Sequence, residues 1–196
     1  MLAYVFWHWR RGDADVGAYE SAQRHFHDVL AAEPSSGFRG SFSHALSGAP
    51  WANAGGDAYE DWYLVDGSAA LDPLNTAAVT AARQAPHDAA AAHAAGGTAG
   101  LYRLRLGTVS GSPTVAQWFA KPAGMPYPEL FALLEGPVTA AHGALFLRQM
   151  TLGPTTECVL LAPAAATLPK SIDALTLRLR PVVTRHPATR SAPAGI

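Results

Sequence analysis

Residues 2–9 read LAYVFWHW, and the expected class of fold follows from them. Side chains alternate along a strand, so one face carries Tyr4, Phe6 and His8, and the other carries Ala3, Val5, Trp7 and Trp9. Both faces are apolar. A strand of this kind must be covered on both sides, which predicts a sheet inside the molecule with another layer against each face.

The elements that follow complete a recognisable order. Asp15 is placed to cap a helix that Pro34 stops, and its apolar stripe predicts packing on a sheet. Two strands come next, at 38–46 and 59–65, with a glycine-rich loop between them. An alanine-rich, proline-broken helical region and an alternating strand, Leu101 to Leu106, close the first half. The predicted order is strand, helix, strand, strand, helix, strand.

A shorter version of the same order returns after residue 113. The expected elements are a strand at 115–121, a helix at 129–135 ended by Gly136-Pro137, a hairpin of 143–152 and 155–161 around Gly153-Pro154, a short or irregular helix at 164–173 and a strand at 175–180. We therefore predict two units, 1–107 and 114–186, followed by a loose tail at 187–196.

Each unit would leave an apolar sheet face uncovered, and packing one sheet on the other would bury both faces. At this point the chain resembles the dimeric α+β barrel (ferredoxin-like) superfamily, with both units supplied by one chain. The first half is most similar to EthD-like and antibiotic-biosynthesis-monooxygenase-like proteins. The residues that carry this likeness are Arg24-His25-Phe26-His27 within Tyr19–Leu30, Gly37-Phe38, Tyr59–Val65 and Ser68-Ala69-Ala70-Leu71. The resemblance implies an α+β fold of tandem ferredoxin-like repeats packed sheet to sheet as an intrachain barrel.

The resemblance also implies a cavity for a small hydrophobic or aromatic, often polyketide-like, molecule. Some relatives oxidise such compounds without metal or cofactor, some hold haem through a histidine, and many have no demonstrated activity. The expected function is therefore small-molecule binding, with cofactor-independent oxygenation or proton transfer as its chemistry. The alternatives are a non-catalytic protein of the same fold that binds a ligand or partner, and a haem-binding member, so whether the chain is an enzyme stays open.

Three residues are the candidates for catalysis. His8 lies near the end of a central strand, where an imidazole could act as a general base on a phenol or enol. His44 has the corresponding parity on its own strand, so it could meet His8 across the sheet. Arg103 on the closing strand could orient an anionic oxygen. The alternative for each histidine is a hydrogen-bonded core residue.

Five further residues are candidates for ligand binding. Trp7, Trp62 and Tyr63 offer aromatic surface for a planar molecule, although aromatic side chains on strands more often serve the core. His25 is expected nearer the buried stripe of its helix than His27. Glu60 shares a face with Trp62 and would need a partner, for which Arg103 or Arg105 is available.

Composition excludes several classes of function. A net charge of -1 gives no basic field for nucleic acid, and near-neutral charge favours self-association, for which a homodimer is one form. The single cysteine, Cys158, rules out an internal disulfide and suits a reducing compartment. There is no export signal or membrane-length apolar run, so we expect a soluble cytoplasmic protein, and the use of Ala, Gly and Pro suggests a bacterial source. No spacing indicates a phosphate loop or a metal site.

Overall fold

The structure is a computed structural model that describes residues 1–109, 111–149 and 156–187. Its strands are β1 (Leu2–Arg10), β2 (Phe38–Leu46), β3 (Ala58–Val65), β4 (Ala94–Gly107), β5 (Val115–Phe119), β6 (Ala144–Arg148), β7 (Cys158–Ala162), β8 (Ala174–Arg178) and β9 (Arg180–Pro187). Its α-helices are α1 (Val16–Ala32), α2 (Leu71–Ala78), α3 (Gln84–Ala91) and α4 (Tyr127–Ala140). The predicted α+β class is confirmed.

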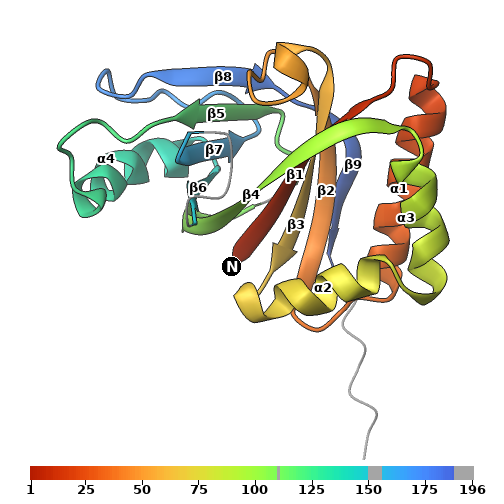
Figure 1. The fold of residues 1–196 in the computed structure, drawn as a ribbon. Coiled ribbons are helices and arrows are strands. Elements are labelled where there is room, and N and C mark those ends of the chain that lie inside the picture. The colour runs from red at the N-terminus through yellow and green to blue at the C-terminus, as the bar shows by residue number, and fades with distance from the viewer. Residues whose placement is uncertain (110, 150–155, 188–196) are drawn as a thin grey trace, which may run out of the picture.

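All nine strands of the described residues form one antiparallel sheet in the order β8-β5-β7-β6-β4-β1-β3-β2-β9. The first half contributes the neighbours β4-β1-β3-β2, and α1, α2 and α3 lie beside these strands (Figure 1). The second half contributes β8-β5-β7-β6, with α4 alongside. Strand β4 joins the halves by pairing with β6.

The sheet bends back on itself. Strands β8 and β9 lie at its opposite ends, yet only Leu179 separates them along the chain. The two ends of the sheet are therefore held within one residue of each other, which requires strong curvature. One buried cluster fills the inside of this curve and combines Val5, Trp7 and Trp62 from the first half with Trp118 and Phe146 from the second.

The two faces of β1 have different surroundings, as the alternation predicts. Val5 and Trp7 point into the cluster inside the curve, whereas Tyr4 and Phe6 pack against residues of the helix-covered face. A bulge in β2 between Phe38 and Gly40 changes the parity there. Phe38 consequently lies on the helix-covered face and Phe42 lies inside, although an unbroken strand would place residues four apart on one face.

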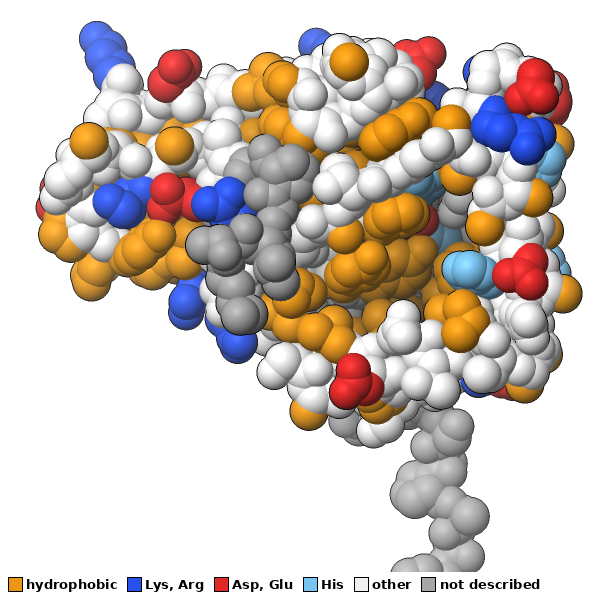
Figure 2. All heavy atoms as spheres, in the orientation of Figure 1, with side chains coloured by type: hydrophobic (Ala, Val, Ile, Leu, Met, Phe, Trp, Pro, Cys, Tyr) orange, Lys and Arg blue, Asp and Glu red, His pale blue; other side chains and the backbone are white. Residues whose placement is uncertain are grey.

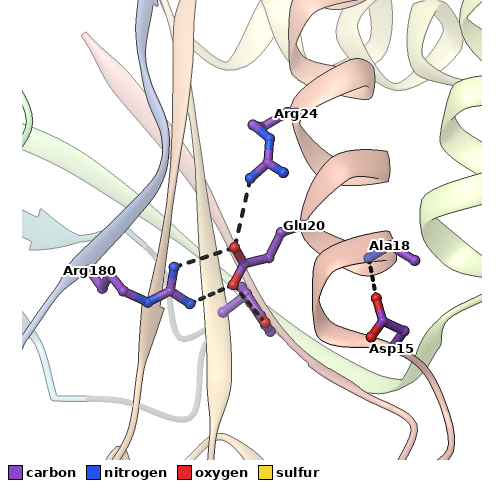
Figure 3. A network of polar contacts seen from close by, with 6 residues as sticks. Asp15, Ala18, Glu20, Arg24 and Arg180 are labelled. Atoms are coloured by element: carbon purple, nitrogen blue, oxygen red, sulfur yellow. Dashed lines mark hydrogen bonds and ion pairs between the residues drawn. The ribbon is translucent and has the colours of Figure 1, made fainter.

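Helix α1 is fixed at its start and along its side. The Asp15 carboxylate accepts the amide of Ala18 at 2.8 Å, which caps the helix as predicted. Glu20, further along α1, accepts hydrogen bonds from both terminal nitrogens of Arg180 in β9 (Figure 3). Its Oε2 atom also lies 3.7 Å from a terminal nitrogen of Arg24. This pairing ties α1 to the last strand described.

Three expectations for the second half are corrected. Helix α4 continues through Pro137 to Ala140, because its buried face includes Leu134 and Val138 and packing outweighs the hydrogen bond that proline lacks. Residues 164–173 contain no helix. The strand expected at 175–180 ends at Arg178, and Arg180–Pro187 forms a further strand, β9, because β2 offers it an edge.

The boundaries of the proposed two units stay a prediction. The turn expected at Gly153-Pro154 and residues 188–196 of the expected tail lie outside the described residues. Within the described ranges, no helix is both long enough and apolar enough to span a membrane.

Candidate active site

A cavity of about 640 Å³ lies between the helix-covered face of the first half and its three α-helices. Its wall is formed by β1, β3 and β4 on one side and α1, α2 and α3 on the other. The residues that line it are Tyr4, Phe6, His8, Tyr19, Gln23, Phe26, Leu30, Asp61, Tyr63, Leu71, Leu74, Asn75, Ala78, Val79, His87, Ala90, Ala91, Ala94, Ala99, Gly100 and Leu101. Figure 2 shows it as a hollow with apolar side chains, in the area that β4, α2 and α3 enclose in Figure 1.

Strand register brings the polar residues of the cavity together. Phe6 of β1 lies opposite Asp61 of β3, and Tyr4 lies opposite Tyr63, so the side chains of these four residues share one face. Helix α1 lies over the same face and contributes Tyr19, whose side chain is fully buried. An apolar cavity with a few converging polar groups is the usual form of a small-molecule site.

Asp61 is the centre of the polar end. Its Oδ2 atom accepts the hydroxyl of Tyr63 at 3.0 Å, and it lies 3.2 Å from His8 Nε2 and 3.5 Å from His27 Nε2. Neither of these two nitrogens forms a hydrogen bond with the carboxylate or with any other described residue. Asp61 Oδ1 is buried and has no hydrogen-bond partner among the described residues.

The charge of Asp61 decides the protonation of its neighbours. Burial alone would raise the pKa of the Asp61 carboxyl, but the attraction of His8 and His27 outweighs burial and holds this pKa well below its ordinary value. Burial, followed by the charge of Asp61, raises the pKa of Tyr63 far above its usual range. At neutral pH the centre is therefore a carboxylate that accepts a hydrogen bond from the neutral phenol of Tyr63.

His8 connects Asp61 to Tyr19. Its Nδ1 atom forms a hydrogen bond with the Tyr19 hydroxyl, while Nε2 faces the carboxylate. Burial, then the charge of Asp61, raises the pKa of Tyr19, so this residue keeps its proton at neutral pH. We therefore assign the imidazole proton to Nε2, beside Asp61, so that Nδ1 accepts a hydrogen bond from the Tyr19 hydroxyl. The rings of Phe6 and Tyr59 stack on the imidazole and fix its plane.

His27 is a second imidazole on the same carboxylate. Its Nδ1 atom lies 2.7 Å from Ser41 Oγ of β2, and its ring stacks on Tyr63 at 5.3 Å between centroids. His27 does not line the cavity. It therefore contacts Asp61 from the side away from the cavity.

The other face of β3 carries a separate buried pair. Glu60 Oε2 accepts the indole N–H of Trp7 at 3.3 Å, and Glu60 Oε1 lies 3.7 Å from His44 Nδ1. Glu60 lies opposite His44 in the register, while its neighbour Asp61 points to the helices. Glu60 and Asp61 thus serve opposite sides of the sheet.

The structure separates the residues proposed from the sequence into two places. Only His8 and Tyr63 line the cavity, whereas Trp7, Trp62, His44 and Glu60 lie inside the curve of the sheet. The expectation that His8 and His44 meet is wrong, because the register places their side chains on opposite faces.

Three further placements differ from expectation. Arg103 is on the cavity's side of the sheet, but it donates to Gln149 Oε1 at 3.0 Å and does not line the cavity. Glu60 takes Trp7 and His44 as neighbours in place of an arginine. His25 is exposed and His27 is buried, because the sheet meets α1 along the line of Tyr19 and His27. Roles for these residues stay predictions.

Sequence reasoning missed Asp61, Tyr19 and His27 as site residues. One signal was present: Tyr19, Gln23 and His27 are four residues apart, which puts polar groups in one row on a helix. An acidic pair, Glu60-Asp61, in the middle of an aromatic strand was a second signal. In the part of the chain that the structure describes, no three His, Cys, Asp or Glu residues form a group suited to a metal ion.

Comparison with known proteins bears on the fold. No family model matches the chain, and no curated protein matches it. One similar crystal structure is a "putative monooxygenase" from Lactobacillus acidophilus NCFM, with a TM-score of 0.57 and 7% identity, over 93% of this chain and 95% of the other. Another is an anthrone oxidase-like protein, with a TM-score of 0.52 and 10% identity, over 100% of this chain and 96% of the other. At these identities the likeness establishes a shared α+β fold and nothing of the chemistry.

Proposed function

We propose that the cavity binds an aromatic or polyketide-like molecule and that His8, acting through Tyr19, removes a proton from it, so that O₂ oxidises the resulting anion without metal or organic cofactor. The observation that carries this proposal is the chain of contacts Asp61–His8–Tyr19 at the polar end of an otherwise apolar cavity. The names of the two similar structures, a monooxygenase and an anthrone oxidase-like protein, support the choice of reaction.

The proton moves in two linked steps. Tyr19 lines the cavity and accepts the proton of the substrate while its own hydroxyl proton passes to His8 Nδ1. The imidazolium that forms lies 3.2 Å from Asp61, whose negative charge stabilises it. Tyr19 stays neutral throughout, which agrees with its raised pKa.

The atoms and electrons of the oxygenation that follows balance with O₂ as the only oxidant. An aromatic ketone with an activated methylene loses one proton, and its carbanion transfers an electron to O₂. The two radicals combine and are protonated to a hydroperoxide. Loss of water from this hydroperoxide, with cleavage of its O–O and C–H bonds, leaves a carbonyl. The sum is R₂CH₂ + O₂ → R₂C=O + H₂O, with one oxygen atom in each product.

We also propose a more detailed assignment of the fold. Tandem ferredoxin-like units, at 1–107 and 114–186, would pack as a barrel related to the EthD-like and antibiotic-biosynthesis-monooxygenase-like proteins. Support comes from the strand orders β4-β1-β3-β2 and β8-β5-β7-β6, in which the two halves place corresponding strands alike. A homodimer stays a prediction.

Anthrone is the probe for the test. The purified protein should accelerate O₂ consumption and anthraquinone formation above the rate in buffer, and with ¹⁸O₂ the product should gain one labelled oxygen. His8→Asn and Tyr19→Phe should each lower kcat by about 100-fold or more, the usual range for loss of a general base. His142→Asn is the matched control, because His142 is exposed in the second half and its positive φ of 48° suits asparagine.

Three other results would contradict the proposed reaction or favour an alternative function. Activity that a chelator abolishes would contradict the cofactor-free reaction. A Soret band in the purified protein would support the haem-binding alternative. Binding of anthrone without turnover would leave the non-catalytic alternative.

A further inference from the structure

We propose that the cavity selects an uncharged aromatic molecule bearing a hydroxyl or enol group and excludes the corresponding carboxylate. This inference deepens the proposed function, because it narrows the substrate class of the same site. It rests on the charges of the cavity wall, on one unpartnered oxygen and on the character of the remaining surface.

The charge of the wall disfavours anions. None of the described residues that line the cavity is Lys or Arg, so no permanent cation is available to neutralise a bound carboxylate. Asp61 lines the polar end and is fully buried. A second carboxylate next to it would bring two like charges together in a poorly solvated place, which weakens binding.

The Oδ1 atom of Asp61 can accept a hydrogen bond from a ligand. Asp61 Oδ1 is buried without a hydrogen-bond partner among the described residues, whereas Oδ2 accepts from Tyr63 and faces both imidazoles. A hydroxyl or enol of a ligand would donate to Oδ1 and remove the cost of leaving it unpaired. A carboxylate has no proton to donate there.

The rest of the wall suits aromatic rings. Tyr4, Phe6 and Phe26 present aromatic surface, and Leu71 and Leu74 of α2 add aliphatic surface. A cavity of about 640 Å³ is within the ordinary range for ligands of several rings. An ammonium group could also meet Asp61, but two imidazoles already occupy its charged side. The uncharged donor therefore fits best.

Four matched naphthalenes test the proposal by direct titration calorimetry at pH 7. They are 2-naphthol, naphthalene, 2-naphthoate and 2-naphthylmethylammonium, which share a ring system and differ in the head group. We expect 2-naphthol to bind at least tenfold more tightly than each of the others. In Asp61→Asn the preference for 2-naphthol over 2-naphthoate should shrink by at least tenfold, because the like charge is gone.

The control is Asp66→Asn, the same change at an exposed carboxylate that pairs with Arg39, and it should keep the original ranking. If Asp61→Asn does not fold, the ranking in the unaltered protein is still decisive. Equal or tighter binding of the carboxylate or the ammonium compound would overturn the proposal. Selective binding of 2-naphthol without oxidation of anthrone would contradict the proposed oxygenation but support the proposed selectivity. Oxidation of anthrone without selective binding of 2-naphthol would contradict only the proposed selectivity.

Discussion

Asp61 is the residue on which the candidate site depends. A carboxylate in a buried place is costly unless its charge is compensated, and here two imidazoles and one phenol surround Oδ2. The adjacent Glu60 meets a similar need on the opposite face with Trp7 and His44. Two neighbouring acidic residues therefore have unrelated surroundings, and only Asp61 reaches the cavity.

The depressed pKa of Asp61 predicts how stability depends on pH. Because the pKa is lower in the folded state than in the unfolded state, Asp61 contributes stability above the unfolded value near pH 4, and this contribution is lost as the pH falls through the folded pKa. Asp61→Asn should cost about 3–5 kcal/mol at pH 7, the usual cost of removing one partner of a buried pair. The loss should be smaller in acid.

Urea unfolding of the wild type and Asp61→Asn between pH 2 and pH 7 checks this prediction, because the loss begins near pH 4 and continues down to the lowered folded pKa. The two curves of unfolding free energy against pH should converge toward low pH. Parallel curves would show that Asp61 is not the group that titrates. The exposed Asp66 again supplies the control substitution, Asp66→Asn.

At the level of elements, helix α1 contributes polar side chains to the cavity that the strands do not provide. The row Tyr19, Gln23 and His27 on α1 completes the polar end that β1 and β3 begin. Helix position matters as much as strand register, and α1 is held by its Asp15 cap and by the Glu20–Arg180 pair with β9. Glu20 is partly exposed, and hydrogen bonding to Arg180 is the main cause that lowers the pKa of its carboxyl.

Helix α4 offers a test of how packing overrides local preference. Pro137 lies inside this helix, where it removes one backbone hydrogen bond, whereas Pro128 lies in the first turn, where no bond is lost. We expect Pro137→Ala to stabilise the protein by about 1–2 kcal/mol, since a proline inside a helix costs about 3 kcal/mol and the freer unfolded chain takes back up to about 1 kcal/mol.

Pro128→Ala is the matched control and should change stability little or lower it slightly. Thermal unfolding of both variants gives the comparison. If Pro137→Ala lowers the melting temperature, the proline is required by the packing of α4 and the argument from the lost hydrogen bond is wrong.

Across the whole molecule, the halves share one interior. The cluster inside the curved sheet combines side chains from both, and Trp62 lies 5.1 Å from Phe146 between ring centroids. The sheet is continuous through the pairing of β4 with β6, and β9 returns to the edge of β2. Neither half has a complete core without the other, so we expect them to unfold together.

Phe146→Ala tests this coupling. Truncation of a buried phenylalanine should cost about 3–5 kcal/mol. The loss should shift the unfolding of both halves equally, as measured by hydrogen exchange of the amides in β1 and in β7. Leu175→Ala, at an exposed position in β8, should change little. Separate midpoints for β1 and β7 would show that the halves are independent.

Most of the first half was predictable because its elements are encoded locally. The apolar run at residues 2–9, the aromatic run at 59–65, the Asp15 cap and the stripe on the first helix depend on neighbours along the chain. The second half was less predictable where tertiary contacts outweigh local signals. Pro137 inside α4 and the pairing of Arg180–Pro187 with β2 are the examples.

The α+β class, the order of the early elements and the two faces of β1 follow from the amino-acid sequence alone, because helix and strand periods are properties of a local stretch of chain. Which polar residues meet depends on the three-dimensional packing of the strands and helices. Register put His8 beside Asp61 and His44 beside Glu60, and the line along which α1 touches the sheet buried His27 and exposed His25. Such distances depend on the relative placement of segments far apart in the chain, which periodicity within one segment does not specify.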